Sequence, residues 1–356
     1  MEGKLKILVA PLNWGLGHAT RLVPVIRRYR REGHEVLLGG EGNSLAFLRE
    51  EFPNLQWVEL PSFSPRFSKT SRQVTKLIEQ LPRFFYMIWL EYRQTRAIVK
   101  KYGIDVIISD NRYGVRNRRC QSIIITHQLS PFITQKKNGF RRWMVSFGID
   151  VMLSAFDVCW IPDTTEGDSL AGELAVPVLP LKNLAKVGLL SRFNPDETPF
   201  LPGGAPLAMI SGPEPQRSIF EDKIIRFFEQ RDEEAIIIRG LPLHPHKIER
   251  RGKIILLSHC NTQEFALLIR SARYIVCRSG YSTIMDLMVL GRRALLVPTP
   301  GQPEQEYLAA RMGQFGFEST TQDNLLFIDR YKPFNRISSI FTPMQGFRGV
   351  DLNRGR

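Results

Sequence analysis

The chain has 356 residues, of which 43% are hydrophobic and 24% charged, and its formal net charge is +14. This length suits two domains better than one core, and this composition excludes a disordered chain. The basic residues are spread out and no nucleic-acid-binding signature is present, so the charge indicates an anionic membrane surface or a phosphorylated substrate and no nucleic acid.

The first half of the chain alternates short apolar runs with longer mixed segments. We expect strands at 5–10, 34–38, 56–60, 104–109, 122–126 and 157–161. We expect helices at 18–32, 43–52, 73–101 and 139–155. The strand runs are rich in β-branched residues and rarely alternate with polar ones, which is typical of strands buried on both faces of a parallel sheet. The order therefore predicts a doubly wound α/β domain.

The second half repeats this plan. We expect strands at 206–211, 235–239, 253–257, 273–277 and 293–297. We expect helices at 215–230, 262–271, 282–290 and 303–313. Pro, Gly and polar residues between the halves indicate a flexible linker. We predict an N-terminal domain at 1–187, a linker at 188–205, a C-terminal domain at 206–330 and an irregular tail at 331–356.

Two features bear on the location of the protein. The four cysteines form no C-x-x-C pair, and no apolar run is long enough for a signal peptide or a membrane span. We therefore expect a cytoplasmic protein with reduced thiols. The aromatic segment 73–101, flanked by Arg and Lys, suits a membrane-surface helix, but an amphipathic helix packed on the first sheet is favoured. Pro82 should lie in the first turn of its second part.

The first strand leads into the turn NWGLGHAT. Gly15 and Gly17 would let the backbone approach a phosphate or a developing anion at the helix start. Thr20 takes the place of a third glycine, which argues against a dinucleotide-binding dehydrogenase. His18 could accept a proton from a hydroxyl nucleophile, or it could cap or pack at the helix start. The sequence leaves both roles open.

A second strand-to-helix turn reads CRSGYSTIMDL. Ser282 or Thr283 would cap the helix that follows. Asp286 comes three residues after Thr283, which is the spacing of a capping box. The same carboxylate could instead accept both hydroxyls of a ribose, with the loop and the helix start beneath a diphosphate. The spacing does not separate these two interpretations.

Further polar residues follow other strands. In ISGPEPQRS, Ser211, Gly212 and Arg217 could contact phosphate, or the segment is only a Pro-rich loop. In VPTPGQPEQEY, Gln305 and Glu306 could bind sugar hydroxyls, or they only complement a helix dipole.

Three residues of the first half come directly after strands: Asp110, Asn111 and His127. Ligands of open parallel sheets gather at the carboxyl ends of the strands, so these side chains are candidates for the site. No D-x-D motif and no metal-ligand pattern occurs in the sequence, and we predict neither a metal nor a cofactor.

The run CRSGYSTIMDLMVLGRRALLVPTPGQPEQEY resembles the donor-binding region of MurG-like GT-B glycosyltransferases, which are related to glycosyltransferase family 28. GLGH is similar to the first glycine-rich loop of these enzymes, and ISGPEPQR stands where they have a diphosphate loop. The resemblance implies a GT-B fold of two Rossmann-like doubly wound domains that face each other across a cleft. It implies a nucleotide-sugar donor in the C-terminal domain and an acceptor in the N-terminal one.

The resemblance also implies roles for single residues. Asp286 would bind the ribose, although the usual residue there is Glu, and Gln305 and Glu306 would contact the donor sugar. His18 would be the candidate base. The other donor-binding candidates are Ser211, Gly212, Arg217, Arg278, Ser279, Gly280 and Thr283, with the uracil against Asn261 and Thr262. On the acceptor or phosphate side the candidates are Gly15, Gly17, Asp110, Asn111 and His127.

These patterns favour an inverting, metal-independent glycosyltransferase that moves a sugar from a UDP-sugar, with UDP-GlcNAc as one candidate, to a hydroxyl of a glycan or lipid-linked acceptor. The protein would be cytoplasmic and could bind the inner face of the cell membrane peripherally. A nucleotide-sugar hydrolase or epimerase of the same fold is one alternative. A non-catalytic nucleotide-sugar-binding subunit is the other.

Overall fold

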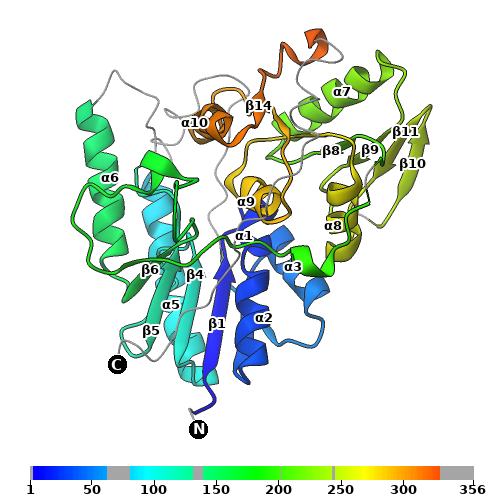
Figure 1. The fold of residues 1–356 in the computed structure, drawn as a ribbon. Helices are drawn as coiled ribbons and strands as arrows, with labels where there is room; N and C mark the ends of the chain where they lie inside the picture. Colours follow the sequence, from blue (N-terminus) through cyan, green and yellow to red (C-terminus); the bar gives the residue numbers. More distant parts are fainter. Residues whose placement is uncertain (1–2, 62–80, 131–138, 202, 243–244, 329–356) are drawn as a thin grey trace. The chain divides into compact units, whose positions relative to one another are not determined.

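The computed structural model describes residues 3–61, 81–130, 139–201, 203–242 and 245–328 (Figure 1). The tail predicted at 331–356 and the first part of the helix predicted at 73–101 lie outside these residues. The chain divides into two compact units between Leu190 and Ser191. Each unit is built on its own seven-stranded sheet.

Unit 1 carries a parallel sheet with the strand order β3-β2-β1-β4-β5-β6-β7. Its strands are β1 (Lys6–Pro11), β2 (Glu35–Gly40), β3 (Trp57–Glu59), β4 (Val106–Asp110), β5 (Gln121–Ile125), β6 (Val158–Ile161) and β7 (Leu184–Lys186). Its helices are α1 (Leu16–Thr20), α2 (Val23–Arg31), α3 (Gly42–Glu51), α5 (Leu81–Tyr102) and α6 (Gly139–Leu153). Residues 7–10 and all of β4 are buried, as expected for central strands covered on both faces.

The helices α5 and α6 cover the same face of this sheet. The strand register pairs Ala10 with Ser109 and Ser109 with Ile124, and paired residues point to one face. Ala10 packs in one cluster with Val99 of α5, and Ile124 packs in another with Leu153 of α6. The helix predicted at 73–101 therefore packs on the sheet, and Pro82 is its second described residue.

The single helix predicted at 18–32 is two helices, α1 and α2. Pro24 is the second residue of α2, where its missing N–H group costs nothing. The same residue could not continue a helix from α1, because proline removes a hydrogen bond and its ring clashes with the preceding turn. The break leaves Arg21 between the two helices.

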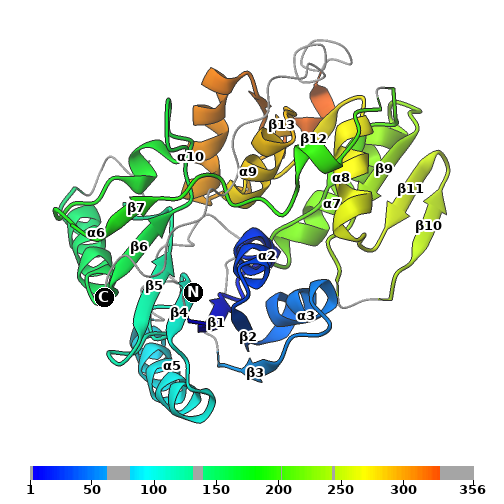
Figure 2. The same cartoon turned by 60° about the horizontal axis from the view of Figure 1, so that its bottom comes forward.

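Unit 2 carries a sheet with the order β10-β11-β9-β8-β12-β13-β14, in which only β10 is antiparallel to its neighbour. Its strands are β8 (Leu207–Met209), β9 (Ala235–Ile238), β10 (Ile248–Arg251), β11 (Ile254–Leu257), β12 (Ile275–Cys277), β13 (Leu295–Leu296) and β14 (Glu318–Ser319). Its α-helices are α7 (Gln216–Glu229), α8 (Thr262–Ser271), α9 (Tyr281–Val289) and α10 (Pro303–Arg311). Figure 2 shows β10 and β11 at one edge of this sheet.

The segment predicted as a flexible linker begins with buried residues. Ser191, Arg192 and Phe193 are each less than a tenth exposed. The ring of Phe193 meets Phe265 of α8 edge-on at 5.7 Å, and the Arg192 guanidinium lies 5.0 Å from the centre of the Phe265 ring. The start of unit 2 is thus anchored by packing and by a cation–π contact.

Candidate functional site

Three residues singled out in the sequence meet at the carboxyl edge of the sheet of unit 1. Asp110 ends β4, His127 follows β5, and His18 lies in the helix after β1. His18 Nδ1 is 2.7 Å from Asp110 Oδ1. These side chains converge because β1, β4 and β5 are adjacent parallel strands whose carboxyl ends share one edge.

A fourth residue, Arg21, completes the cluster. Its Nε donates to Asp110 Oδ2 and its Nη2 donates to Asp110 Oδ1. Its Nη1 lies 3.3 Å from His127 Nδ1, and its Nη2 lies 3.0 Å from His18 Nδ1. Sequence reasoning missed Arg21, although its spacing of three from His18 on a helical segment puts both residues on one face.

The positive charges of this cluster favour the ionised form of Asp110. Burial would raise the pKa of Asp110, but the charges of Arg21 and His18 and their hydrogen bonds hold it below its ordinary value. An ionised carboxylate has no proton to share, so the 2.7 Å contact requires that His18 Nδ1 donates to it. In the neutral imidazole, His18 Nε2 then carries the lone pair. The His18 side chain is 18% exposed, so this nitrogen belongs to a ring that solvent can reach.

The remaining candidates of unit 1 surround this cluster. A Cβ on Gly15 would meet no atom within 4 Å, and the Gly17 carbonyl accepts the Arg21 N–H at 3.3 Å. The helix α1 has five residues, so the dipole expected from a helix at 18–32 is not available. Asn111 has a left-handed backbone with φ of 53°, and its buried side-chain oxygen has no hydrogen-bond partner among the described residues.

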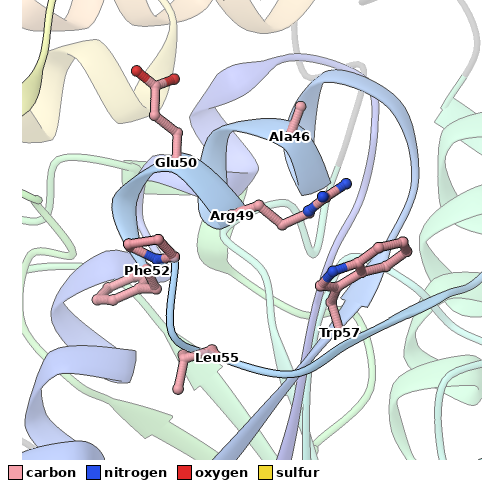
Figure 3. Close-up of a pocket in the computed structure, with 7 residues that line it drawn as sticks. Ala46, Arg49, Glu50, Phe52, Leu55 and Trp57 are labelled. Carbon is pink, nitrogen blue, oxygen red and sulfur yellow. The ribbon is translucent and has the colours of Figure 1, made fainter.

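A pocket of about 410 Å³ lies elsewhere in unit 1 (Figure 3). It is lined by the end of α3 and the start of β3, and the Arg49 guanidinium lies 4.2 Å from the centre of the Trp57 ring. Trp57 begins β3, so this hollow is at the amino edge of the parallel sheet, opposite to the His18 cluster. We therefore do not assign it to the site.

In unit 2, the helix α9 begins one residue earlier than predicted. Gly280 is its N-cap, no side chain caps the helix, and Thr283 lies within the first turn. The predicted hydroxyl cap and the capping-box role of Asp286 are therefore wrong, because the residue at the N-cap position has no side chain. The Gly280 backbone, with φ of −72°, suits any residue, and a Cβ there would meet only Thr283 Oγ1 at 3.9 Å.

The Asp286 carboxylate instead contacts the start of unit 2. The Ser191 hydroxyl donates to Asp286 Oδ1 at 2.6 Å, and the Arg192 backbone N–H also donates to the carboxylate. Burial raises the pKa of Asp286 to about 6, against the opposing effects of the Arg192 charge and these hydrogen bonds. The contact joins residues 95 positions apart, so no local sequence pattern predicts it.

Arg278 and Ser279 are buried and bonded within the protein. The Arg278 guanidinium donates to the carbonyls of Val297, Pro298 and Gln216 at 3.1 Å each and to Gln322 Oε1 at 2.6 Å. Ser279 Oγ donates to a main-chain carbonyl of α10 at 2.8 Å. Both residues are 0% exposed, which argues against the diphosphate contacts suggested by the sequence and indicates a structural role.

Gln305 and Glu306 shape the loop before α10. Gln305 Oε1 accepts the Thr299 N–H at 2.8 Å, and Glu306 Oε1 accepts the Gly301 N–H at 2.9 Å. Gln305 is 7% exposed. These acceptors hold the loop backbone, so contact of either side chain with a donor sugar stays a prediction.

The loop after β8 separates its three candidates. Arg217 pairs with Glu214 at 2.7 Å and Glu221 at 2.6 Å, so carboxylates of the protein already occupy its guanidinium. Ser211 and Gly212 are exposed. Gly212 has φ of 111°, a conformation that favours glycine, and a Cβ there would meet no atom within 4 Å.

Asn261 and Thr262 form the start of α8. The Asn261 side chain accepts the Glu264 N–H at 2.9 Å, and the Glu264 side chain accepts the Asn261 N–H at 3.3 Å, which is a capping box. The Asn261 side chain is therefore used by the helix, and only backbone contact with a base is left as a prediction.

Neither a metal cluster nor a membrane span is found among the described residues. Within the part of the chain that the structure covers, no group of three or more His, Cys, Asp or Glu side chains could hold a metal ion. None of the described helices is sufficiently long and apolar for a membrane crossing.

Comparisons with known proteins identify the fold. Residues 250–326 match the model of the glycosyltransferase family 28 C-terminal domain. The glycotransferase of kitacinnamycin aligns with a TM-score of 0.60 at 17% identity, over 95% of this chain and 92% of that chain. Acinetobacter baumannii MurG aligns with a TM-score of 0.53 at 13% identity, over 94% of this chain and 93% of that chain.

The Arabidopsis thaliana protein UGT89C1, solved with UDP-L-rhamnose, aligns with a TM-score of 0.58 at 15% identity, over 94% of this chain and 92% of that chain. No curated protein matches by sequence. The family match lies in unit 2, and the structural likeness extends over both sheets. The chain therefore has the GT-B fold that these glycosyltransferases share, and residues 250–326 of its second unit match a glycosyltransferase family 28 C-terminal domain.

Proposed function

We propose that the protein is an inverting, metal-independent glycosyltransferase that moves a sugar from a UDP-sugar to a hydroxyl of a glycan or lipid-linked acceptor. The observation that carries this proposal is the contact of His18 Nδ1 with the ionised Asp110 carboxylate at 2.7 Å. In the neutral ring this contact leaves Nε2 of a partly exposed imidazole as a proton acceptor, which a transferase needs and a donor-binding subunit does not.

The chemical step is a single displacement at the anomeric carbon. The acceptor oxygen forms the new bond on the face opposite the diphosphate, the anomeric C–O bond breaks, and UDP leaves with the electron pair. The acceptor proton passes to His18 Nε2. Asp110 then stabilises the imidazolium that results, because its carboxylate already accepts from Nδ1.

Donor binding belongs to unit 2 in this proposal. Asp286 would exchange the Ser191 hydroxyl for the ribose hydroxyls, while the diphosphate would lie against the exposed backbone of Ser211 and Gly212 and the start of α9 at Gly280. Oriented N–H groups at a helix start favour an anion. Arg278 and Arg217 are excluded from this role because their guanidinium groups are engaged within the protein.

An apolar acceptor is supported by exposed aromatic side chains on unit 1. Tyr86 and Trp89 of α5 are 59% and 50% exposed, and Trp143 of α6 is 47% exposed. The Arg93 guanidinium lies 5.0 Å from the centre of the Trp89 ring. Aromatic and basic side chains on helices of one face suit an anionic lipid surface, so we expect sedimentation with anionic vesicles and none with neutral ones.

The test uses the purified protein with a panel of UDP-sugars and acceptors, with released UDP as the readout. Acceptor-dependent release supports transfer, and release without acceptor would support the hydrolase alternative. Binding of a UDP-sugar without turnover would support a non-catalytic subunit.

Replacement of the base gives the sharper measurement. His18→Ala should lower kcat by about 10²–10⁴-fold, the usual contribution of a general base, while the Kd for the donor changes little. His246→Ala, which removes an exposed histidine of unit 2, is the matched control and should retain activity. Equal kcat values for His18→Ala and the wild type would rule out His18 as the base.

A further inference from the structure

Arg21 is a buried charge with an unusual set of neighbours. Its side chain is 1% exposed and that of Asp110 is 0% exposed. A guanidinium is taken out of water only when its charge is balanced, and here both oxygens of one carboxylate receive its N–H groups. The Nη1 atom lies 3.3 Å from His127 Nδ1, so the third nitrogen of the guanidinium also has a partner.

Asp110 Oδ1 is shared between the base and this guanidinium. His18 Nδ1 and Arg21 Nη2 both contact it, and the two nitrogens lie 3.0 Å apart. A carboxylate alone, beside an imidazole, would strongly favour the imidazolium form. Arg21 offsets that charge at the same oxygen and places a positive charge next to the ring.

The charged surroundings of His18 come from few elements. Asp110 ends β4, Arg21 follows α1, and His127 follows β5. The helix α3, which packs against α1, starts after Glu41, and the carboxylate of Glu41 acts on Glu91 of α5. Among the described residues, Asp110 and Arg21 are the charged groups that contact the His18 ring.

We propose that Arg21 is a positioning residue, which fixes the Asp110 carboxylate and offsets its charge, so that His18 Nδ1 donates to Asp110 and the lone pair of the neutral imidazole lies on Nε2. The inference rests on the function proposed above, with His18 as the base. It adds the reason why the carboxylate that orients this base is itself held in place.

Loss of Arg21 disables the base in either of two protonation states. The His18–Asp110 pair then binds a further proton more tightly, since a neighbouring positive charge is gone. If the proton resides on the imidazole, Nε2 has no lone pair. If it resides on the carboxyl, it is donated to Nδ1, the other tautomer is selected, and Nε2 again carries a hydrogen.

The test is the pH dependence of kcat/KM for acceptor-dependent UDP release. In Arg21→Met the acid limb of this pH profile should move to higher pH than in the wild type, by about one to three pH units. Arg21→Lys keeps a positive charge but loses the two-point contact of the guanidinium with the carboxylate. It should lower kcat and move the acid limb of the pH profile less than Arg21→Met does. Arg30→Met, at an exposed position of α2, should match the wild type.

The outcomes separate this inference from the proposed function. No acceptor-dependent release by the wild type would overturn the function itself. An active wild type with an unmoved acid limb in a folded Arg21→Met would overturn only the role of Arg21. If Arg21→Met does not fold, Arg21→Lys decides by its kcat: a value equal to that of the wild type would contradict a positioning role.

Discussion

Replacement of Asp286 by Asn should favour the folded state increasingly as the pH rises from 4 to 7. Burial raises the pKa of this carboxyl in the folded state to about 6, whereas 3.8 is its ordinary value. The folded protein therefore binds this proton more tightly than the unfolded chain. The stabilisation that the protonated form gives is fully present below about pH 4 and is lost as the pH rises through 6.

The size of this effect follows from the two pKa values. One pKa unit corresponds to about 1.4 kcal/mol, so ionisation of Asp286 costs the folded state at most about 3 kcal/mol. The amide that Asp286→Asn introduces cannot ionise, and its oxygen can still accept the Ser191 hydroxyl. The difference in unfolding free energy between Asp286→Asn and the wild type should therefore grow in favour of the variant, by up to that amount, between pH 4 and pH 7.

Urea unfolding followed by circular dichroism at several pH values measures this difference. Asp323→Asn, which removes a carboxylate that is 86% exposed, is the control and should show no such trend. If the difference in unfolding free energy between Asp286→Asn and the wild type does not depend on pH, the conclusion that burial raises the pKa of Asp286 is wrong. The same variant should bind UDP more weakly if the ribose uses Asp286, so stability and donor affinity should change in opposite directions.

Two further substitutions separate folding from donor binding. Arg278→Met should lower the free energy of unfolding by about 2–4 kcal/mol. Three buried carbonyls and one amide oxygen lose their donor at about 1–3 kcal/mol each, and removal of a buried charge offsets part of this cost. Calorimetry on the folded protein should show an unchanged Kd for UDP, and weaker UDP binding at full stability would contradict the structural role. Gly280→Ala should cost less than about 1 kcal/mol of stability, since its backbone suits alanine and the Cβ meets only Thr283 Oγ1 at 3.9 Å. We expect Gly280→Ala to bind UDP clearly more weakly than the wild type. An unchanged Kd for UDP would show that Gly280 is not part of the donor site.

The sequence predicted the sheets because their central strands are continuous buried runs. It missed β7, β10 and β14 for different reasons: β14 has two residues, β7 has three, and β10 reads IERR with exposed side chains, which is a weak strand signal. The break between α1 and α2 could have been read from Pro24, which is favoured at a helix start and not in its interior.

The site was predictable where the topology alone determines proximity. The carboxyl ends of adjacent parallel strands bring His18, Asp110 and His127 together, and the sequence contains both the strands and the residues. Arg21 was not predictable in the same way, because it lies between α1 and α2 and does not directly follow a strand. The contact of Ser191 with Asp286 depends on how the start of unit 2 packs, which no spacing along the chain encodes.

The run that resembles the glycosyltransferase family is built largely from residues that hold unit 2 together. Arg278 joins the turn to β13 and α7, and Ser279 joins it to α10. A likeness carried by such residues identifies the turn and its fold, and by itself it identifies no ligand contact. At Gly280 the fold does not require glycine, since neither its φ of −72° nor its surroundings exclude a side chain. Helix N-caps favour glycine over alanine, and close approach of a ligand is a second physical reason for glycine at that position. Substitution of Gly280, and not of Arg278, is therefore the test of donor recognition.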